Sequence, residues 1–338
     1  MKKIVTFGEI MLKLSPHGDL LFSQTNDYQA MFGGSEANVA VALALYGNHS
    51  VYVTKLPNNP IAQKACSSLR AYGVDTSKVV WGGDRLGLYY LERGLMPMTS
   101  TCVYDRKGSA IATARIGDFD WGDIFKDADW FHFSGITAAL SEETAKLCQQ
   151  ACRIAHLKGI TISCDINYRK SLWPMEQARA VMSGLLKYAN VVIINEDEAA
   201  VLGYDKPVKD LMNIERYAEL AAYLFGKYPN CECLASVVRQ KTPQGRAVQG
   251  ILQHNETGVW LTKQYSIDDA IELPGAGDAF CAVLIDSLLK RLTVCECAEL
   301  STAACALKHR IKGDYCLVPM SVIQSLAFAE DGSEGVQR

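Results

Sequence analysis

The run Gly275–Phe280, which reads Gly-Ala-Gly-Asp-Ala-Phe, holds the residues of this chain that are best suited to chemistry. The apolar run Cys281–Ile285 follows it at once and predicts the start of a buried helix. Backbone N–H groups at a helix N-terminus lack intrahelical partners and lie at the positive end of the dipole, so they bind phosphate oxygens. A carboxylate beside such a phosphate makes chemical sense if Asp278 takes a proton from an attacking hydroxyl. The alternative is that Asp278 only caps the helix, and this run alone does not separate the two interpretations.

Length and composition are those of an ordinary globular α/β protein. The chain has 338 residues, of which 49% are hydrophobic and 21% charged, with a formal net charge of −3. This balance predicts neither a nucleic-acid nor a membrane partner. The N-terminal apolar stretch is too short for a signal peptide, and no run approaches a membrane span, so we expect a cytoplasmic protein. The 12 cysteines lie mostly within apolar runs, which predicts reduced structural thiols rather than a metal site.

Strand-like and helix-like runs alternate along the chain, without an internal repeat or a low-complexity linker. The predicted strands are Lys3–Phe7, Ser50–Lys55, Trp130–Ser134, Ile160–Asp165, Val191–Asn195 and Cys233–Val238. The predicted helices are Ser35–Tyr46, Pro60–Tyr72, Ser141–Lys158, Pro174–Tyr188, Arg216–Tyr228, Ala276–Lys290 and Cys295–Lys308. This alternation predicts a mostly parallel sheet with helices on both faces, formed by a single domain over residues 1–338.

Two stretches, at about residues 10–32 and 85–115, contain β-like runs without helices between them. They predict a small sheet over the mouth of the site, a lid that would exclude water from phosphoryl transfer. The alternative is that these runs are edge strands of the main sheet. The apolar run Leu86–Tyr90 also suggests a homodimer through the lid strands. A monodisperse monomer in sedimentation experiments would count against that dimer.

A second glycine pair, Gly33 and Gly34, also precedes a predicted helix, and Asn38 follows it. An early Gly-Gly-x-x-x-Asn together with the late run Gly275–Phe280 resembles the ribokinase-like (PfkB) family of carbohydrate kinases, over nearly the whole chain. The resemblance implies a ribokinase-like three-layer α/β sandwich with a mostly parallel central sheet and a small β lid. Further matching runs are Phe7–Glu9, Asp165–Arg169 and Asn195–Glu198. The finer likeness is to the 2-keto-3-deoxygluconate kinases, through Tyr104–Ala110, Asn167–Arg169, Leu172, Trp173, Gly313 and Asp314.

The resemblance implies a role for each matching position. Asp278 is implied to be the catalytic base, with the N–H groups of Gly275, Ala276 and Gly277 as the anion hole. Gly34 and Asn38 are implied to bind sugar. Asn195 is implied to contribute to the nucleotide site, and Glu198 to bind magnesium through water. The alternative for Asn195–Glu198 is a strand end followed by an acidic helix start.

Two arginines bear on the choice of substrate. A keto-deoxy sugar acid carries a carboxylate, which a guanidinium binds through paired charged hydrogen bonds. The resemblance places Arg106 and Arg169 at the sugar-acid site, with Tyr104 and Tyr90, or its neighbour Tyr89, as further contacts. The alternative is that either arginine is a solvated or structural residue.

Three positions depart from the common family pattern. Glu272 stands where many relatives have Asp, and the added methylene would shift a carboxylate that helps to position a cation. Cys281–Val283 replaces the usual small residues and glycine. The usual Gly-x-x-Gly nucleotide loop is missing, and Val238–Gly245 stands in its place. Arg239 in this stretch is a candidate to contact nucleotide phosphate, from its position and charge alone.

These observations predict an ATP- and Mg2+-dependent kinase that phosphorylates the primary hydroxyl of 2-keto-3-deoxygluconate to give the 6-phosphate. A fructokinase or other neutral-sugar kinase of the same fold is the first alternative, and it would make both arginines bystanders. A catalytically silent sugar-binding sensor is the second, since the altered nucleotide loop leaves room for it.

Overall fold

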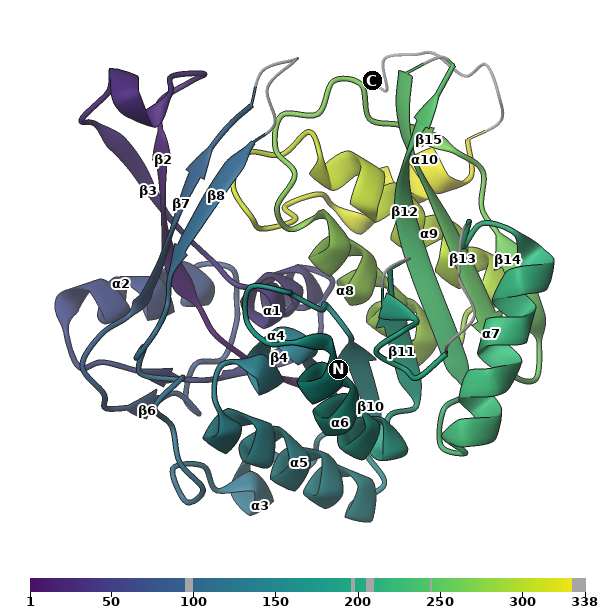
Figure 1. Ribbon diagram of the computed structural model, residues 1–338, viewed down its shortest axis with the longest axis horizontal. Helices are drawn as coiled ribbons and strands as arrows, with labels where there is room; N and C mark the ends of the chain where they lie inside the picture. The colour runs from purple at the N-terminus through teal and green to yellow at the C-terminus, as the bar shows by residue number, and fades with distance from the viewer. Residues whose placement is uncertain (95–99, 196–197, 205–209, 244, 330–338) are drawn as a thin grey trace.

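The computed structural model describes residues 1–94, 100–195, 198–204, 210–243 and 245–329. Its centre is a nine-stranded sheet in the order β14-β13-β12-β11-β10-β9-β1-β4, with β15 paired to β13 (Figure 1). The neighbours from β4 to β12 are parallel, and β13, β14 and β15 are antiparallel additions. The strands are β1 (Lys3–Phe7), β4 (His49–Val53), β9 (Trp130–Ser134), β10 (Thr161–Asp165), β11 (Val191–Ile194), β12 (Cys233–Thr242), β13 (Gly245–His254), β14 (Gly258–Leu261) and β15 (Tyr265–Ser266).

Helices cover both faces of this sheet, as the alternating pattern predicts. One face carries α3 (Trp121–Ile124), α4 (Gly135–Ala139), α5 (Glu142–Leu157), α6 (Met175–Leu185) and α7 (Ile214–Lys227). The other carries α1 (Ser35–Leu45), α2 (Pro60–Arg70), α8 (Ala276–Leu289), α9 (Val294–Lys308) and α10 (Met320–Ala327). Two short 3-10 helices are η1 (Phe22–Gln24) and η2 (Leu186–Tyr188). Strands β5 (Lys55–Leu56) and β6 (Val80–Trp81) form a separate two-stranded sheet.

Strand β11 shows why the central strands are apolar throughout. Val192 and Ile194 pack into the core beneath α5, α6 and α7, whereas Val191 and Ile193 pack beneath α8 and α9. Successive side chains of a strand point to opposite faces, so a strand covered on both sides needs apolar residues at every position.

The strands in the two non-alternating stretches form their own four-stranded sheet, in the order β3-β2-β7-β8. Its strands are β2 (Met11–Pro16), β3 (Tyr28–Gly33), β7 (Gly87–Glu92) and β8 (Thr101–Asp105). We call it the small sheet; it projects from the main body at the upper left of Figure 1. The alternative that these runs are edge strands of the main sheet is therefore wrong. One cross-strand row of the small sheet consists of Met31, Lys13, Tyr89 and Tyr104.

The structure differs from the sequence-based prediction over residues 239–266. The predicted strand ended at Val238, and no helix or strand was predicted between residues 239 and 266. Strand β12 continues to Thr242 and pairs antiparallel with β13, down to Thr242 opposite Gly245. Pro243 follows at the turn, where no backbone N–H is needed for the ladder. The departure from the family's nucleotide loop is thus a long hairpin at the end of the sheet.

All 12 cysteines are free thiols, and most are buried. Among the described residues, no group of three or more His, Cys, Asp or Glu side chains is arranged to hold a metal. Within the same residues, no helix has both the length and the apolar character needed to cross a bilayer.

The fold predicts the effect of a single methyl group at the edge where β9 and β10 end. Gly135, the first residue of α4, packs so closely on the chain after β10 that a Cβ would collide with the carbonyl oxygen of Ile166. We expect Gly135→Ala to lower the free energy of unfolding by about 1–3 kcal/mol, measured by urea unfolding. The matched control is Gly226→Ala in α7, where a Cβ meets open space, and we expect it to be neutral or stabilising by up to about 1 kcal/mol. Equal stability of the two variants would contradict this packing argument.

Candidate active site

The N-terminus of α8 is shaped by glycine. Gly275 is its N-cap and has a φ of 83°, a left-handed conformation that favours glycine. A Cβ there would also collide with the carbonyl oxygen of Asp314. No side chain of the described residues caps this terminus. Its first N–H groups therefore remain available to an anion.

Asp278 lies in the first turn of α8, and its carboxyl is held by α1. Ser35 Oγ donates to Oδ1 at 2.7 Å, and Asn38 Nδ2 donates to Oδ2 at 2.7 Å. The carboxyl thus bonds to the first turn of another helix and not to the backbone of its own, which disfavours the capping interpretation. Although part of Asp278 is open to solvent, burial raises the pKa of its carboxyl, against the opposing effect of the two hydrogen bonds. A raised pKa makes the carboxylate a better proton acceptor near neutral pH.

Gly34 brings the N-terminus of α1 to this position. A Cβ at Gly34 would collide with the carbonyl oxygen of Glu9, so α1 could not approach the end of β1 with a larger residue. The Gly34 N–H also donates to Asn38 Oδ1 at 3.3 Å, which orients the amide that bonds Asp278. Of the sugar-site predictions, Gly34 and Asn38 are therefore brought together with Asp278.

Arg106 follows β8 and is held by a buried acid. Its Nε lies 3.0 Å from Glu9 Oε2, and its guanidinium lies over the Tyr104 ring at 4.9 Å from the centroid. Burial raises the pKa of Glu9, while Arg106 and the hydroxyl of Ser109 act in the opposite direction. The guanidinium is thereby fixed in place, and a guanidinium has five N–H donors, more than these contacts use.

The two adjacent tyrosines of β7 lie on different faces of the small sheet. Tyr89 is buried, stacks on Tyr104 with ring centroids 5.7 Å apart, and donates a hydrogen bond to Asp314 Oδ2. Tyr90 points to the opposite face because side chains alternate along a strand. The structure therefore brings Tyr89 and Tyr104 together with Arg106, and does not bring Tyr90 to the same place.

Asp314, Glu272 and Lys13 form a charge cluster that the sequence did not predict, since it gave Lys13 no role and did not place the three together. Lys13, on β2, is 0% exposed; its Nζ lies 2.9 Å from Asp314 Oδ1 and contacts Glu272 Oε1. Glu272 Oε2 also accepts a hydrogen bond from the Gly313 N–H at 2.6 Å. The longer side chain of Glu272, noted as a departure from the family, reaches this lysine. A lysine in an alternating strand is ordinarily solvent-exposed, so no local pattern marks it as buried.

Glu198 joins the ends of two neighbouring strands. Its carboxyl oxygens accept the backbone N–H groups of Tyr168 and Asn195, each at 2.7 Å. Burial raises the pKa of Glu198, and these backbone bonds lower it. Asp165, at the end of β10, is buried nearby, and burial together with the charge of Glu198 raises its pKa well above the ordinary value. Residues 196 and 197 of the predicted run lie outside the described residues.

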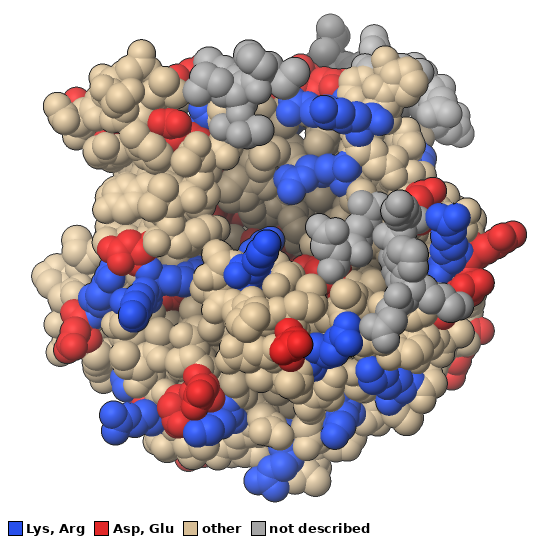
Figure 2. All heavy atoms as spheres, in the orientation of Figure 1, with Lys and Arg blue, Asp and Glu red and all other residues tan. Residues whose placement is uncertain are grey.

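The remaining predicted cations lie at the periphery. Arg169 is exposed, yet close enough that its charge opposes the burial effect on the carboxyls of Asp278 and Glu198. Arg239 is exposed on β12, opposite Val248. Burial lowers the pKa of His309, at the end of α9, to about 4, and the charge of Arg239 acts in the same direction. Figure 2 shows a hollow between the small sheet and the C-terminal half, with Lys and Arg side chains on its rim and acidic atoms inside it.

Comparisons with known proteins agree with this geometry. The family model described as pfkB family carbohydrate kinase matches residues 1–317. The 2-dehydro-3-deoxygalactonokinase of Haloferax volcanii is 30% identical over 338 residues, which cover 99% of both chains. A crystal structure of 2-dehydro-3-deoxygluconokinase from Thermotoga maritima has 39% identity and a TM-score of 0.91, covering 96% of this chain and 98% of that one. A sugar kinase of Pyrococcus horikoshii, solved in complex with ATP, shares the fold at 21% identity with a TM-score of 0.74 over 94% and 96%.

The chain belongs to the pfkB family of carbohydrate kinases. It is accordingly a phosphotransferase with a sugar acceptor, and its fold is ribokinase-like α/β. The prediction of this family and fold from the two glycine motifs is confirmed.

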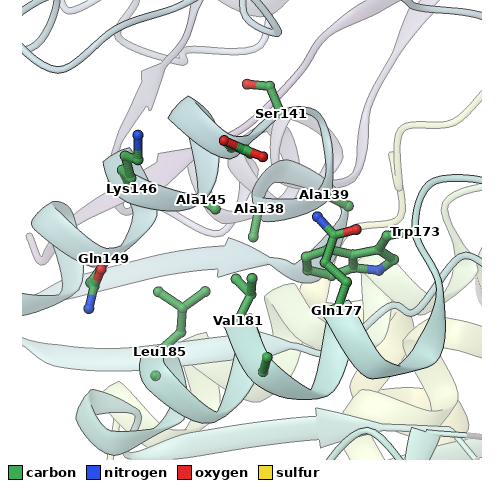
Figure 3. A pocket seen from close by; sticks show the side chains of 13 residues that line it. Ala138, Ala139, Ser141, Ala145, Lys146, Gln149, Trp173, Gln177, Val181 and Leu185 are labelled. Atoms are coloured by element: carbon green, nitrogen blue, oxygen red, sulfur yellow. The ribbon is translucent and has the colours of Figure 1, made fainter.

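A groove elsewhere on this PfkB kinase holds none of the predicted site residues. It lies between α5 and α6 beside α4 (Figure 3). Its lining residues are Ala138, Ala139, Ser141, Glu142, Ala145, Lys146, Gln149, Trp173, Gln177, Ala180, Val181, Gly184 and Leu185. The candidate catalytic residues lie instead at the N-termini of α1 and α8.

The charge cluster predicts a loss of stability in Lys13→Met. Without the ammonium, Asp314 and Glu272 stay buried without their shared cation, and we expect the free energy of unfolding to fall by about 3 kcal/mol near neutral pH. The measurement is urea unfolding near neutral pH.

Lys290→Met is the matched control, because Lys290 pairs with the buried Asp286 through a side chain that is 50% exposed. We expect a loss of at most about 1 kcal/mol from this control. A Lys13→Met deficit no larger than that of Lys290→Met would contradict the assignment of a shared buried cation.

Proposed function

We propose that this PfkB kinase transfers the γ-phosphoryl group of ATP to the primary hydroxyl of 2-keto-3-deoxygluconate, giving the 6-phosphate. The names of the Thermotoga and Haloferax relatives support a 2-keto-3-deoxy sugar acid as the acceptor class. The second candidate acceptor is 2-keto-3-deoxygalactonate, which the name of the Haloferax relative supports.

The observation that carries the proposal is the placement of the Asp278 carboxyl, held at 2.7 Å by both Ser35 and Asn38 beside the uncapped N-terminus of α8. Asp278 takes the proton of the sugar hydroxyl as the oxygen attacks the γ-phosphorus. The new O–P bond forms while the bond to the β-phosphate oxygen breaks, and ADP leaves with that electron pair. The N–H groups of Gly275, Ala276 and Gly277 bind the transferred group, so positioning and electrostatics lower the barrier.

Arg106 and Arg169 are the groups that we assign to the carboxylate of the acceptor. Arg106 is oriented by Glu9 and by the Tyr104 ring, which leaves N–H donors for a second carboxylate. Arg169 is exposed beyond the end of β10, where ligands of parallel sheets bind. Tyr104 and Tyr89 belong to the same row of the small sheet and would line the sugar, with the small sheet acting as a lid that excludes water.

The nucleotide would lie along the carboxyl ends of the parallel strands, towards β12. Asn195 follows β11 on this edge, and Arg239 lies further along the long hairpin. The exposed guanidinium of Arg239 near the end of α9 supports its assignment to nucleotide phosphate.

Magnesium suits the acidic groups beside β10 and β11, because it prefers oxygen ligands and keeps much of its water. Asn167 Oδ1 is a buried oxygen without a hydrogen-bond partner in the described part of the chain, and its amide nitrogen donates to Asp165. Asp165 and Glu198 would hold the ion, Glu198 through water because both of its oxygens already accept backbone N–H groups. When bound, the ion supplies positive charge against the phosphates.

Asp278→Asn tests the proton acceptor. The amide keeps the size of the side chain but cannot take the proton, so we expect kcat to fall by about 10²–10⁴-fold. The measurement is ADP release in a coupled assay, with thermal unfolding as the check of folding. Asp286→Asn is the control, because Asp286 is a buried acid of the same helix that bonds Asn48 and Lys290, and its kcat should stay near wild type. Near-normal turnover in a folded Asp278→Asn enzyme would remove the proposed base.

The acceptor is tested with a panel of 2-keto-3-deoxygluconate, 2-keto-3-deoxygalactonate, gluconate, fructose and ribose. We expect the highest kcat/KM with a 2-keto-3-deoxy sugar acid. Arg169→Ala should raise the KM for that acid by about 10–100-fold, the value of a charged hydrogen bond, with a smaller change in kcat.

Lys170→Ala removes the neighbouring exposed cation and should change that KM by less than about twofold. A preference of the wild type for fructose or ribose would reject the sugar-acid proposal and favour the neutral-sugar kinase. Sugar binding in calorimetry without phosphoryl transfer would favour the silent sensor.

A further inference from the structure

Lys308, the last residue of α9, has a fully buried side chain. It is 0% exposed, and its Nζ donates to the carbonyl oxygen of Ile311 at 3.1 Å. Its Cε lies 3.1 Å from where a Cβ on Gly275 would stand. The ammonium therefore lies in the layer directly behind the N-cap of α8, where α8 and α9 pack together (Figure 1).

This ammonium is not neutralised as the other buried lysine is. Lys13 has two carboxylates within 4 Å, whereas no carboxylate of the described residues lies that close to the Lys308 nitrogen. A buried charge without a counter-ion is strongly unfavourable. The positive end of the α8 dipole beside it adds a second positive potential. An anion bound at the N-terminus of α8 would be attracted by the Lys308 ammonium and by the positive end of the helix dipole.

We propose that Lys308 is a positioning residue of the phosphoryl-transfer site, whose ammonium supplies a fixed positive charge behind Gly275 and strengthens the grip of the anion hole on the γ-phosphoryl group. This inference rests on the proposed role of Gly275, Ala276 and Gly277. A lysine at a helix C-terminus can also serve only to bond the last carbonyl groups, as its contact with Ile311 does. The two roles make different predictions about nucleotide binding.

The pH dependence of ATP binding distinguishes them. Burial lowers the pKa of Lys308 to about 8, and the charge of Asp314 acts in the opposite direction. Below this pH the ammonium is charged and attracts the phosphoryl group, and above it the charge is lost from the free enzyme. ATP affinity should therefore fall as pH rises above about 8, where phosphate groups are already fully ionised.

Other titratable and charged groups surround Lys308. They come from α8, from α9, from the chain after α9 and from the small sheet, and they are Asp278, Cys305, His309, Asp314, Cys316 and Lys13. Burial raises the pKa of Cys305 to about 12 and also raises that of Cys316, while it lowers that of His309 to about 4. These shifts move the three groups away from the range in which Lys308 titrates.

The experiment is calorimetric titration of the full-length enzyme with ATP and, separately, with ADP, without sugar, at about pH 7.5 and about pH 9.5. For wild type we expect the ATP affinity to fall by about three- to tenfold between the two pH values, since a one-unit rise in the lysine pKa on binding is a tenfold effect. ADP affinity should change by less than about twofold, because ADP lacks the γ-phosphoryl group.

Two variants assign the effect to this residue. Lys308→Met should bind ATP about tenfold more weakly at the lower pH and show no further loss at the higher pH. Lys308→Arg keeps its charge throughout this range and should show no loss at the higher pH even if its affinity differs from wild type. Lys290→Met, at the far end of α8, should keep the wild-type affinities and pH dependence.

Stability provides an independent readout. The folded pKa of Lys308 is below its unfolded value, so the unfolded state binds more protons between about pH 8 and about pH 10. Deprotonation therefore favours the folded state while it weakens ATP binding. For Lys308→Met we expect unchanged or higher thermal stability together with weaker ATP binding.

The inference is overturned if ATP and ADP respond to pH alike, or if Lys308→Arg retains the wild-type loss. If Lys308→Met is less stable but binds ATP as tightly as wild type, the inference is also overturned. Lys308 would then serve only to bond the carbonyl oxygen of Ile311. These outcomes are distinguishable from a failure of the proposed function, which the wild-type acceptor panel and Asp278→Asn report without any change at Lys308.

Discussion

The contact between the first turns of α1 and α8 is the constraint on which the rest of the site depends. Ser35 and Asn38 donate to a carboxyl that lies 243 and 240 positions away in the chain. Helix N-termini are both positive, so they approach each other favourably only when an acidic group lies between them. Asp278 is that group. Glycine at both N-caps seats each helix against another part of the chain, because a Cβ would collide with the carbonyl oxygen of Glu9 at Gly34 and with that of Asp314 at Gly275.

In the proposed mechanism, the same contact explains why a carboxylate beside a phosphate site is tolerable. Its two oxygens are occupied by neutral donors from α1, while the N–H groups of its own helix remain free for the phosphoryl group. Asp278 and the proposed anion hole thus belong to one helix turn but use different partners. This separation lets a raised pKa and an anion-binding terminus coexist within a few ångströms.

The small sheet is joined to this centre by polar and charged contacts as well as by apolar packing. Lys13 and Tyr89, from the same cross-strand row, both bond the carboxyl of Asp314, whose carbonyl oxygen packs against Gly275. A buried ion pair contributes less net stability than apolar packing of the same volume, but it tolerates few alternative arrangements. We interpret Asp314 as the junction that fixes the small sheet relative to the N-terminus of α8.

The amino-acid sequence by itself determined the family and the alternation of strands and helices, and it pointed to Asp278 as the candidate acid, because each depends on short-range patterns such as glycine before an apolar helix. The helix bounds were close: the expected Ala276–Lys290 is Ala276–Leu289 in the structure. The sequence did not determine that Tyr89, and not Tyr90, lies beside Tyr104. A shift of one residue in register moves a strand residue to the opposite face of the sheet. The sequence also left Lys13 and Lys308 unremarked, because a lysine is ordinarily exposed. Only tertiary packing, which brings β2, α8 and α9 together, decided that these two charges are buried near the first turn of α8.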